Sequence, residues 1–182
     1  MDRQPVLEDD RLLLRPLEAA DWDALYAVAS DPAVWELHPV NTRWQEPVFR
    51  AFFAEALGEG GALIAINRAS GKVAGSSQFR GHDPQASQVE IGWTFLGRDH
   101  WGGETNRAMK RLMLGHALQT VERVVFRIGE TNLRSRRAME KIGGQLTDAC
   151  EVIEGPNGPI VHVVYAIDRE GFAAGPLAAR SG

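Results

Sequence analysis

The segment "RDHWGGETNRAMKRLM", Arg98 to Met113, joins two glycines to the start of an amphipathic helix. The first N–H groups of a helix lack internal partners, and the helix macrodipole makes that end positive. Glycine allows a ligand to approach the backbone closely. Together these features predict an anion site suited to a di- or triphosphate, although a strand-to-helix turn that binds nothing fits the loop equally well. Glu104 stands where a phosphate loop favours glycine.

Several other kinds of site are excluded by the sequence. No Gly-Lys-Ser/Thr follows the glycines, so the loop is not a P-loop, and no His/Cys spacing resembles a metal site. The net charge of -4 gives no electrostatic basis for binding nucleic acid or an anionic membrane surface. No apolar run approaches the ~20 residues that a membrane helix needs. With a single cysteine and a polar N-terminus, the chain is expected to be cytoplasmic.

Hydrophobic periodicity and turn residues predict the elements that would position this loop, in the order β-α-α-β-β-β-α-β-α-β-β. Hairpins on one side and strand-helix-strand crossovers on the other indicate an α/β fold with a mixed sheet. We expect a single domain over residues 1–170 and a flexible tail over 171–182. The expected strands are 11–17, 62–67, 72–79, 88–97, 123–129, 145–153 and 160–168, and the expected helices are 19–30, 46–57, 106–119 and 133–144, with a loop at 31–44.

Three stretches carry a family resemblance: "VEIGWTFLGRDHWGGETNRAMKRLM", "VVFRIGETNLRSRRAMEKIGG" and "RLLLRPLEAADWDALYAVASDP". Over residues 10 to 168 the chain resembles the GNAT superfamily of acetyl-CoA-dependent N-acetyltransferases. It is most similar to the branch that acetylates the N-termini of ribosomal proteins. The resemblance implies a splayed mixed β-sheet flanked by helices, with acetyl-CoA inserted where two parallel strands part.

The resemblance also implies which residues bind acetyl-CoA. Phe95 and Leu96 would offer backbone groups to the pantetheine arm, Asn132 would hydrogen-bond it, and Arg137 or Arg136 would meet the nucleotide. For the basic side chains of the second helix, a solvated surface is the alternative. Glu104 takes the place of a small residue of the family loop, so it points outward, caps the helix N-terminus while the site is empty, or repels the pyrophosphate. The residues expected around the pyrophosphate are Arg98, Gly102, Gly103, Thr105 and Asn106.

Catalysis by amine attack on a thioester needs a donor for the leaving group and benefits from a base. The resemblance places Ser135 near the thioester sulfur, whereas Met139 replaces the tyrosine of many relatives and is predicted to fill the core. Glu90 is the first candidate for the base, with a plain outward-facing strand glutamate as the alternative. His38 and His82 are weaker candidates.

The segment between the first two helices covers the acceptor site in the family, so we expect His38, Arg43 and Trp44 to bind substrate and Trp35 to pack in the core. The implied reaction moves an acetyl group from acetyl-CoA to a primary amine, either a protein N-terminus or a small molecule, without a metal. A catalytically silent acyl-CoA sensor and an interaction domain are the alternatives. Pairing of the final hairpin with a second copy would give a homodimer.

Overall fold

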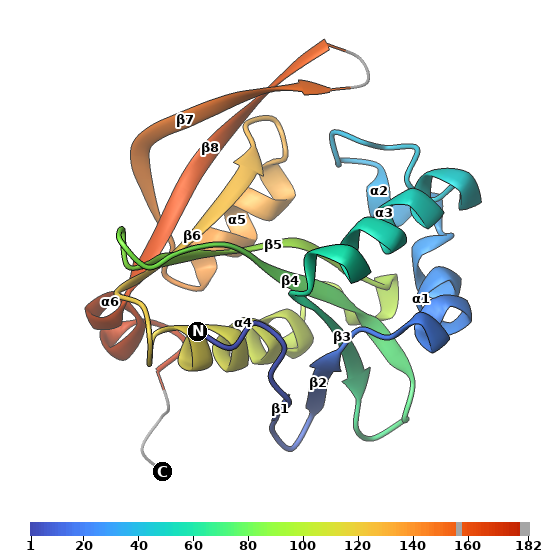
Figure 1. Ribbon diagram of the computed structural model, residues 1–182, viewed down its shortest axis with the longest axis horizontal. Helices are drawn as coiled ribbons and strands as arrows, with labels where there is room; N and C mark the ends of the chain where they lie inside the picture. Colours follow the sequence, from blue (N-terminus) through green and yellow to red (C-terminus); the bar gives the residue numbers. More distant parts are fainter. Residues whose placement is uncertain (156–157, 179–182) are drawn as a thin grey trace.

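The computed structural model describes residues 1–155 and 158–178. Its strands form one mixed sheet in the order β1-β2-β3-β4-β5-β6-β8-β7 (Figure 1). The predicted fold class is therefore confirmed. The strands are β1 Leu7–Glu8, β2 Leu12–Pro16, β3 Ala62–Asn67, β4 Val73–Asp83, β5 Gln88–Leu96, β6 Arg123–Gly129, β7 Gln145–Gly155 and β8 Gly158–Asp168.

Helices cover both faces of the sheet. In Figure 1, α1, α2 and α3 lie together beside one end of the sheet, and α4 runs along its other side. The core therefore has two clusters: Phe49 and Phe95 belong to the one with α1–α3, and Met109 and Ile91 to the one with α4. The helices are α1 Trp22–Ala29, α2 Pro32–Trp35, α3 Glu46–Glu59, α4 Glu104–Ala117, α5 Leu133–Lys141 and α6 Arg169–Ala174, with short 3₁₀ helices at Ala19–Asp21 and Arg98–His100.

Strands β5 and β6 are the parallel pair of the sheet, and they pair over only three positions, from Gln88↔Arg123 to Glu90↔Val125. Beyond Glu90, β5 continues against β4, while β6 continues against β8. The two strands therefore part, which is the arrangement that the family resemblance implies. The backbone of β5 beyond Glu90 keeps one edge turned toward the opening.

A bulge in β5 accompanies the parting. The register with β4 shifts between Ser76 and Gln78, and Trp93 has a φ of 52°. Side chains of a regular strand alternate between the two faces of a sheet. Ile91 packs in the cluster with α4, and after the bulge it is Leu96 that does so, while Trp93 and Phe95 join the other cluster. The bulge thus resets which residues face α4.

Three parts of the structure differ from the sequence prediction. The predicted loop at 31–44 contains α2, because Asp31 accepts a hydrogen bond from the Ala33 N–H and Pro32 suits the first turn. Leu7 and Glu8, which precede the first predicted strand, form β1. The predicted tail from residue 171 contains the end of α6 and the buried Leu177, which packs into the core near α4. Residues 179–182, and residues 156–157 of the final turn, lie outside the described residues.

The backbones of β4 and β5 approach each other closely at Gly75, and a substitution there tests this contact. The φ of Gly75 is 155°, and a Cβ added there would lie 2.0 Å from the Phe95 carbonyl oxygen. We expect Gly75→Ala to lower the free energy of unfolding by about 3 kcal/mol or more, because backbone cannot move aside cheaply. Urea denaturation measures this.

Gly58 is the matched control. It lies in α3, and a Cβ added there meets no heavy atom within 4 Å. Gly58→Ala should leave stability unchanged or raise it by up to ~1 kcal/mol, since alanine favours helix. Equal effects of the two substitutions would contradict the close approach at Gly75.

Candidate active site

A cavity of about 280 Å³ opens where β5 and β6 part. Residues 91–96 of β5 and 126–129 of β6 form two of its walls. The helix α4 contributes Asn106 and Lys110, and the start of α5 contributes Asn132 and Ser135. The cavity is therefore lined by strand edges that have left the β5–β6 ladder and by the ends of two helices.

Asn132 and Ser135 lie at the cavity, where the sequence placed them. The Asn132 side chain is 7% exposed and caps α5, because its Oδ1 accepts a hydrogen bond from the Ser135 N–H at 3.2 Å. This is the usual contact of an asparagine N-cap. Asn132 thus fixes the first turn of α5 and, with it, the position of the Ser135 hydroxyl.

The glycine loop leads from the end of β5 to α4. The Trp101 indole N–H donates to the Leu96 carbonyl at 2.9 Å, which fastens the loop to the strand. Gly102 lines the cavity with a φ of 66°, a conformation that favours glycine. Gly103 is the N-cap of α4 and Glu104, which is exposed, is its first residue. The positive end of α4 therefore begins at the edge of the cavity.

Some residues predicted around the pyrophosphate have other partners. Phe95, Leu96 and Asn106 line the cavity. The Arg98 guanidinium instead forms an ion pair with Asp31 at 2.5 Å, and the Thr105 hydroxyl lies 3.2 Å from His100 Nδ1. Both polar groups are therefore occupied by neighbours within the protein.

Arg134 lines the cavity, whereas the predicted Arg137 does not. The Arg134 guanidinium lies over the Trp101 ring, 4.3 Å from the ring centroid. Arg137 is exposed and is not part of the cavity lining. On α5 the lining residues Arg134, Ser135 and Ala138 share one face, and Arg137 flanks that face on the side away from Ser135.

Glu90 is buried rather than outward-facing, with 7% of its surface exposed. Arg127 Nη1 lies 2.5 Å from Glu90 Oε2, and Arg127 Nε lies 2.8 Å from Glu151 of β7. Burial raises the pKa of Glu90, and the charge of Arg127 opposes that rise. It is Arg127 that lines the cavity, so the structure places Glu90 behind this arginine.

The acceptor side of the cavity is only partly as predicted. His38 lines it, and its Nδ1 accepts a hydrogen bond from the Val40 N–H at 2.9 Å. Burial and the nearby Arg43 lower the pKa of His38 to about 3, so the ring is neutral at pH 7 and is a poor proton acceptor. Arg43 reaches His38 at 3.2 Å and packs over the Phe52 ring.

Of the two tryptophans of this region, it is Trp35 and not Trp44 that lines the cavity. Trp44 is 36% exposed and lies outside the cavity lining, and its carbonyl accepts a hydrogen bond from the Tyr26 hydroxyl. Trp35 is 2% exposed, so it is a core residue as predicted, yet it also lines the cavity. A side chain can serve both purposes when the cavity borders the core.

Lys110 and His162 line the cavity although the sequence analysis did not select them. Lys110 is 4% exposed, and its Nζ donates to Thr94 Oγ1 at 2.7 Å and to Ser77 Oγ at 3.3 Å. Burial lowers the pKa of Lys110 to about 7. Lys110 lies one turn after Asn106 and three residues before the buried Met113, so helical phase alone could have placed it.

Within residues 1–155 and 158–178, no group of three or more His, Cys, Asp or Glu side chains is arranged to hold a metal ion. No described helix combines the length and the apolar character that crossing a bilayer requires.

The fold and the cavity define an acyl-transferase architecture, and comparison with known families identifies it further. Residues 11–145 match the family described as acetyltransferase (GNAT) domain, and the chain belongs to this family. The predicted superfamily is thus confirmed. No match was found among the curated proteins.

Solved structures share the fold at low sequence identity. A GCN5-related N-acetyltransferase from Brucella melitensis has a TM-score of 0.84 at 19% identity, covering 94% of this chain and 81% of that one. The microcin C7 self-immunity acetyltransferase, solved with acetyl-CoA and AMP, has a TM-score of 0.71 at 14% identity, covering 88% and 93%. The ribosomal-protein-S5-alanine acetyltransferase from Vibrio fischeri has a TM-score of 0.65 at 11% identity, covering 92% and 98%. These identities establish a shared fold and do not assign the ribosomal branch.

The Glu90–Arg127 pair generates a pH-dependent prediction. Arg127→Met removes the positive partner of a buried carboxylate and should lower the free energy of unfolding by about 1–3 kcal/mol at neutral pH. The pKa of Glu90 is already raised in the folded state, so protonation of Glu90 favours folding. This contribution to the free energy of unfolding is lost as the pH rises through that pKa. Without Arg127 the pKa rises further. The stability deficit of Arg127→Met should therefore be larger at pH 8 than at pH 5, measured by thermal unfolding.

Glu90→Gln provides the control for this prediction. Its carboxamide cannot ionise, so the double variant Glu90→Gln/Arg127→Met should lose the extra deficit at pH 8. A deficit of Arg127→Met that is independent of pH would show that the arginine does not stabilise an ionised Glu90.

Proposed function

We propose that this protein transfers an acetyl group from acetyl-CoA to a primary amine by direct attack within a ternary complex. The observation that supports this most is the cavity at the parting of β5 and β6. It combines an open strand edge, the N-terminus of α4 and the Asn132–Ser135 turn. The protein's membership of the GNAT family supports the same reaction class.

The residues of the cavity fit an elongated ligand with amide groups at one end and phosphates at the other. The β5 backbone between Ile91 and Leu96 can exchange hydrogen bonds with amides, as a neighbouring strand would. The first N–H groups of α4 suit a pyrophosphate, and a Cβ added at Gly102 would meet no atom within 4 Å, so the loop leaves room. When bound, acetyl-CoA would supply the activated acetyl group.

The two sides of the cavity suggest different roles. His38, with Arg43 beside it, faces the acceptor amine in our proposal, and Glu90 with Arg127 sets the local charge for it. The amine must lose a proton to react. Because Glu90 lies behind Arg127, it would act as a base through an intervening water rather than by direct contact. Ser135 is proposed to donate a hydrogen bond to the leaving sulfur.

Acetyl-CoA binding is the first test. Calorimetric titration of wild type with acetyl-CoA should give micromolar affinity, and Glu104→Gln should bind about threefold more tightly, because removing an exposed carboxylate beside a diphosphate relieves ~0.6 kcal/mol of repulsion. Glu104 is the first residue of α4, and the substitution preserves its shape.

Glu122→Gln is the matched control. Glu122 is exposed between α4 and β6, so this substitution removes the same charge at a different place on the surface. It should not change affinity. Weaker binding by Glu104→Gln would mean that the carboxylate contributes to the site, and an absence of acetyl-CoA binding by wild type would overturn the proposed function.

Substitutions at the turn before α5 test the catalytic assignment. Asn132→Ala and Ser135→Ala should each lower kcat/KM toward a reactive primary amine by about tenfold or more, since each removes a hydrogen-bonding group from the reaction site. Asn132→Ala should also cost about 1 kcal/mol of stability through the lost cap.

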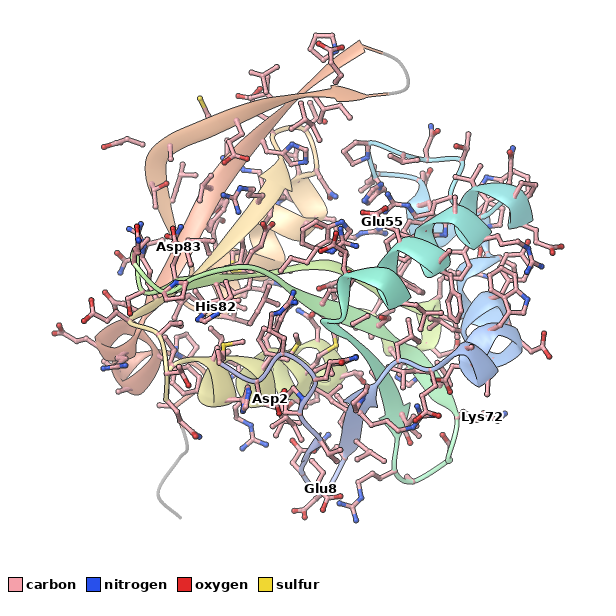
Figure 2. The ribbon with its side chains drawn as sticks, viewed as in Figure 1. Asp2, Glu8, Glu55, Lys72, His82 and Asp83 are labelled. Carbon is pink, nitrogen blue, oxygen red and sulfur yellow. The ribbon has the colours of Figure 1, made fainter. Side chains whose placement is uncertain are left out.

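His82 provides the comparison. Figure 2 shows it beside Asp83 at the end of β4, at the β4–β5 turn, and it is not among the residues lining the cavity. His82→Ala should retain near wild-type activity. Similar activity in all three variants would refute the site assignment, and turnover of any amine would eliminate the silent acyl-CoA sensor.

A further inference from the structure

Lys110 is a buried amine with only neutral partners. Its Nζ donates to hydroxyls on β4 and β5, and the Phe126 ring of β6 lies beside it, 5.8 Å from Nζ to the ring centroid. Across residues 1–155 and 158–178, no carboxylate forms an ion pair with it. The buried Arg80 and the half-buried Arg127, by contrast, are paired with Glu55 and Glu90.

An amine without a counter-ion at a core position lowers the stability of the fold. Burying an ammonium without a counter-ion disfavours its charged form, whereas a methionine would fill the same space at no electrostatic cost. Burial lowers the pKa of Lys110 to about 7, and no charged neighbour contributes to that shift. The amine is therefore poised between its two forms near neutral pH, and an anion placed next to it would favour the ammonium.

The position of Lys110 indicates which part of a ligand it meets. It lines the cavity from α4, on the face of the sheet where Ile91 and Leu96 pack. His38 lines the cavity beside Trp35, which belongs to the cluster on the opposite face. Lys110 thus approaches the β5 edge from the side away from the proposed acceptor. A group in this position can interact with the leaving group without occupying the space of the acceptor amine.

We propose that Lys110 binds the thiolate of CoA, the leaving group of the transfer. This inference rests on the proposed function. The attacking amine forms the new C–N bond, the C–S bond breaks, and the electron pair stays on sulfur. The amine's excess proton leaves to solvent, and the ammonium of Lys110 neutralises the charge on sulfur. By linkage, the thiolate favours the protonated lysine, and the protonated lysine favours the thiolate.

The test is the ionisation of the CoA thiol on the protein. The ultraviolet absorbance of the thiolate is followed against pH for CoA bound to wild type, to Lys110→Met and to Arg111→Met. The thiol should ionise about one pKa unit or more lower on wild type than on Lys110→Met, since the variant lacks the nearby positive charge. Arg111 is the next residue of α4, is paired with Asp9 at the surface, and serves as the control that should match wild type.

Affinity gives a second readout. At pH 8, Lys110→Met should bind free CoA about threefold more weakly than wild type, which is what a thiol pKa lower by one unit gives at that pH. Its affinity for acetyl-CoA should stay within about twofold of wild type, because the thioester carries no charge. Identical thiol ionisation on wild type and Lys110→Met would overturn the inference while leaving the proposed function intact. If wild type bound neither CoA nor acetyl-CoA, the proposed function would fail instead.

Thr94→Val keeps the inference testable if Lys110→Met does not fold. It removes the nearer hydroxyl acceptor and leaves the lysine, so the ammonium is less stabilised. The thiol pKa should then lie between the value on wild type and that of CoA in solution. A thiol that ionises on wild type as it does in solution would refute the role of Lys110 whatever the variants do.

Discussion

The parting of β5 from β6 is the constraint on which the rest of the structure depends. Three paired positions hold the strands together. Beyond them β5, which is bulged at Trp93, stays paired with β4, while β6 stays paired with β8. A sheet that opens leaves backbone donors and acceptors without a neighbouring strand, and such groups need another partner. The open strand edge therefore offers hydrogen-bonding groups that a bound ligand could satisfy. The ends of α4 and α5 converge on the opening and supply further N–H groups.

Three cations around the opening are stabilised in three different ways. Arg127 forms ion pairs with Glu90 and Glu151, and these two carboxylates favour its charged form. Arg43 lies against aromatic rings and a neutral histidine, and burial lowers its pKa to about 10. Lys110 has only hydroxyl partners. The arginines keep their charge at any physiological pH, whereas the lysine responds to what binds beside it.

Local signals in the sequence were sufficient for most of the fold. The bounds of β3 and β6 agree with their prediction, and Asn132 lies where an Asx N-cap must lie relative to Ser135. Contacts between distant segments could not be predicted, because no local pattern encodes them. Arg98 pairs with Asp31 across 67 residues, and Arg127 with Glu90 across 37. Arg134 and Lys110 are intermediate cases: the sequence analysis did not select them for the site, although their spacing from Ala138 and Asn106 on the same helices could have placed them there.

The hydroxyl partners of Lys110 explain how a buried amine can respond to a ligand. A carboxylate in place of Thr94 would hold the ammonium permanently, and a thiolate would then gain little from it. Two hydroxyls can accept from the ammonium or donate to the free amine, so neither form of the lysine is left without a hydrogen-bond partner. The exposed Glu104 at the rim does not disturb this balance, because solvent screens it. The anion that decides the protonation of Lys110 must therefore come from the cavity itself.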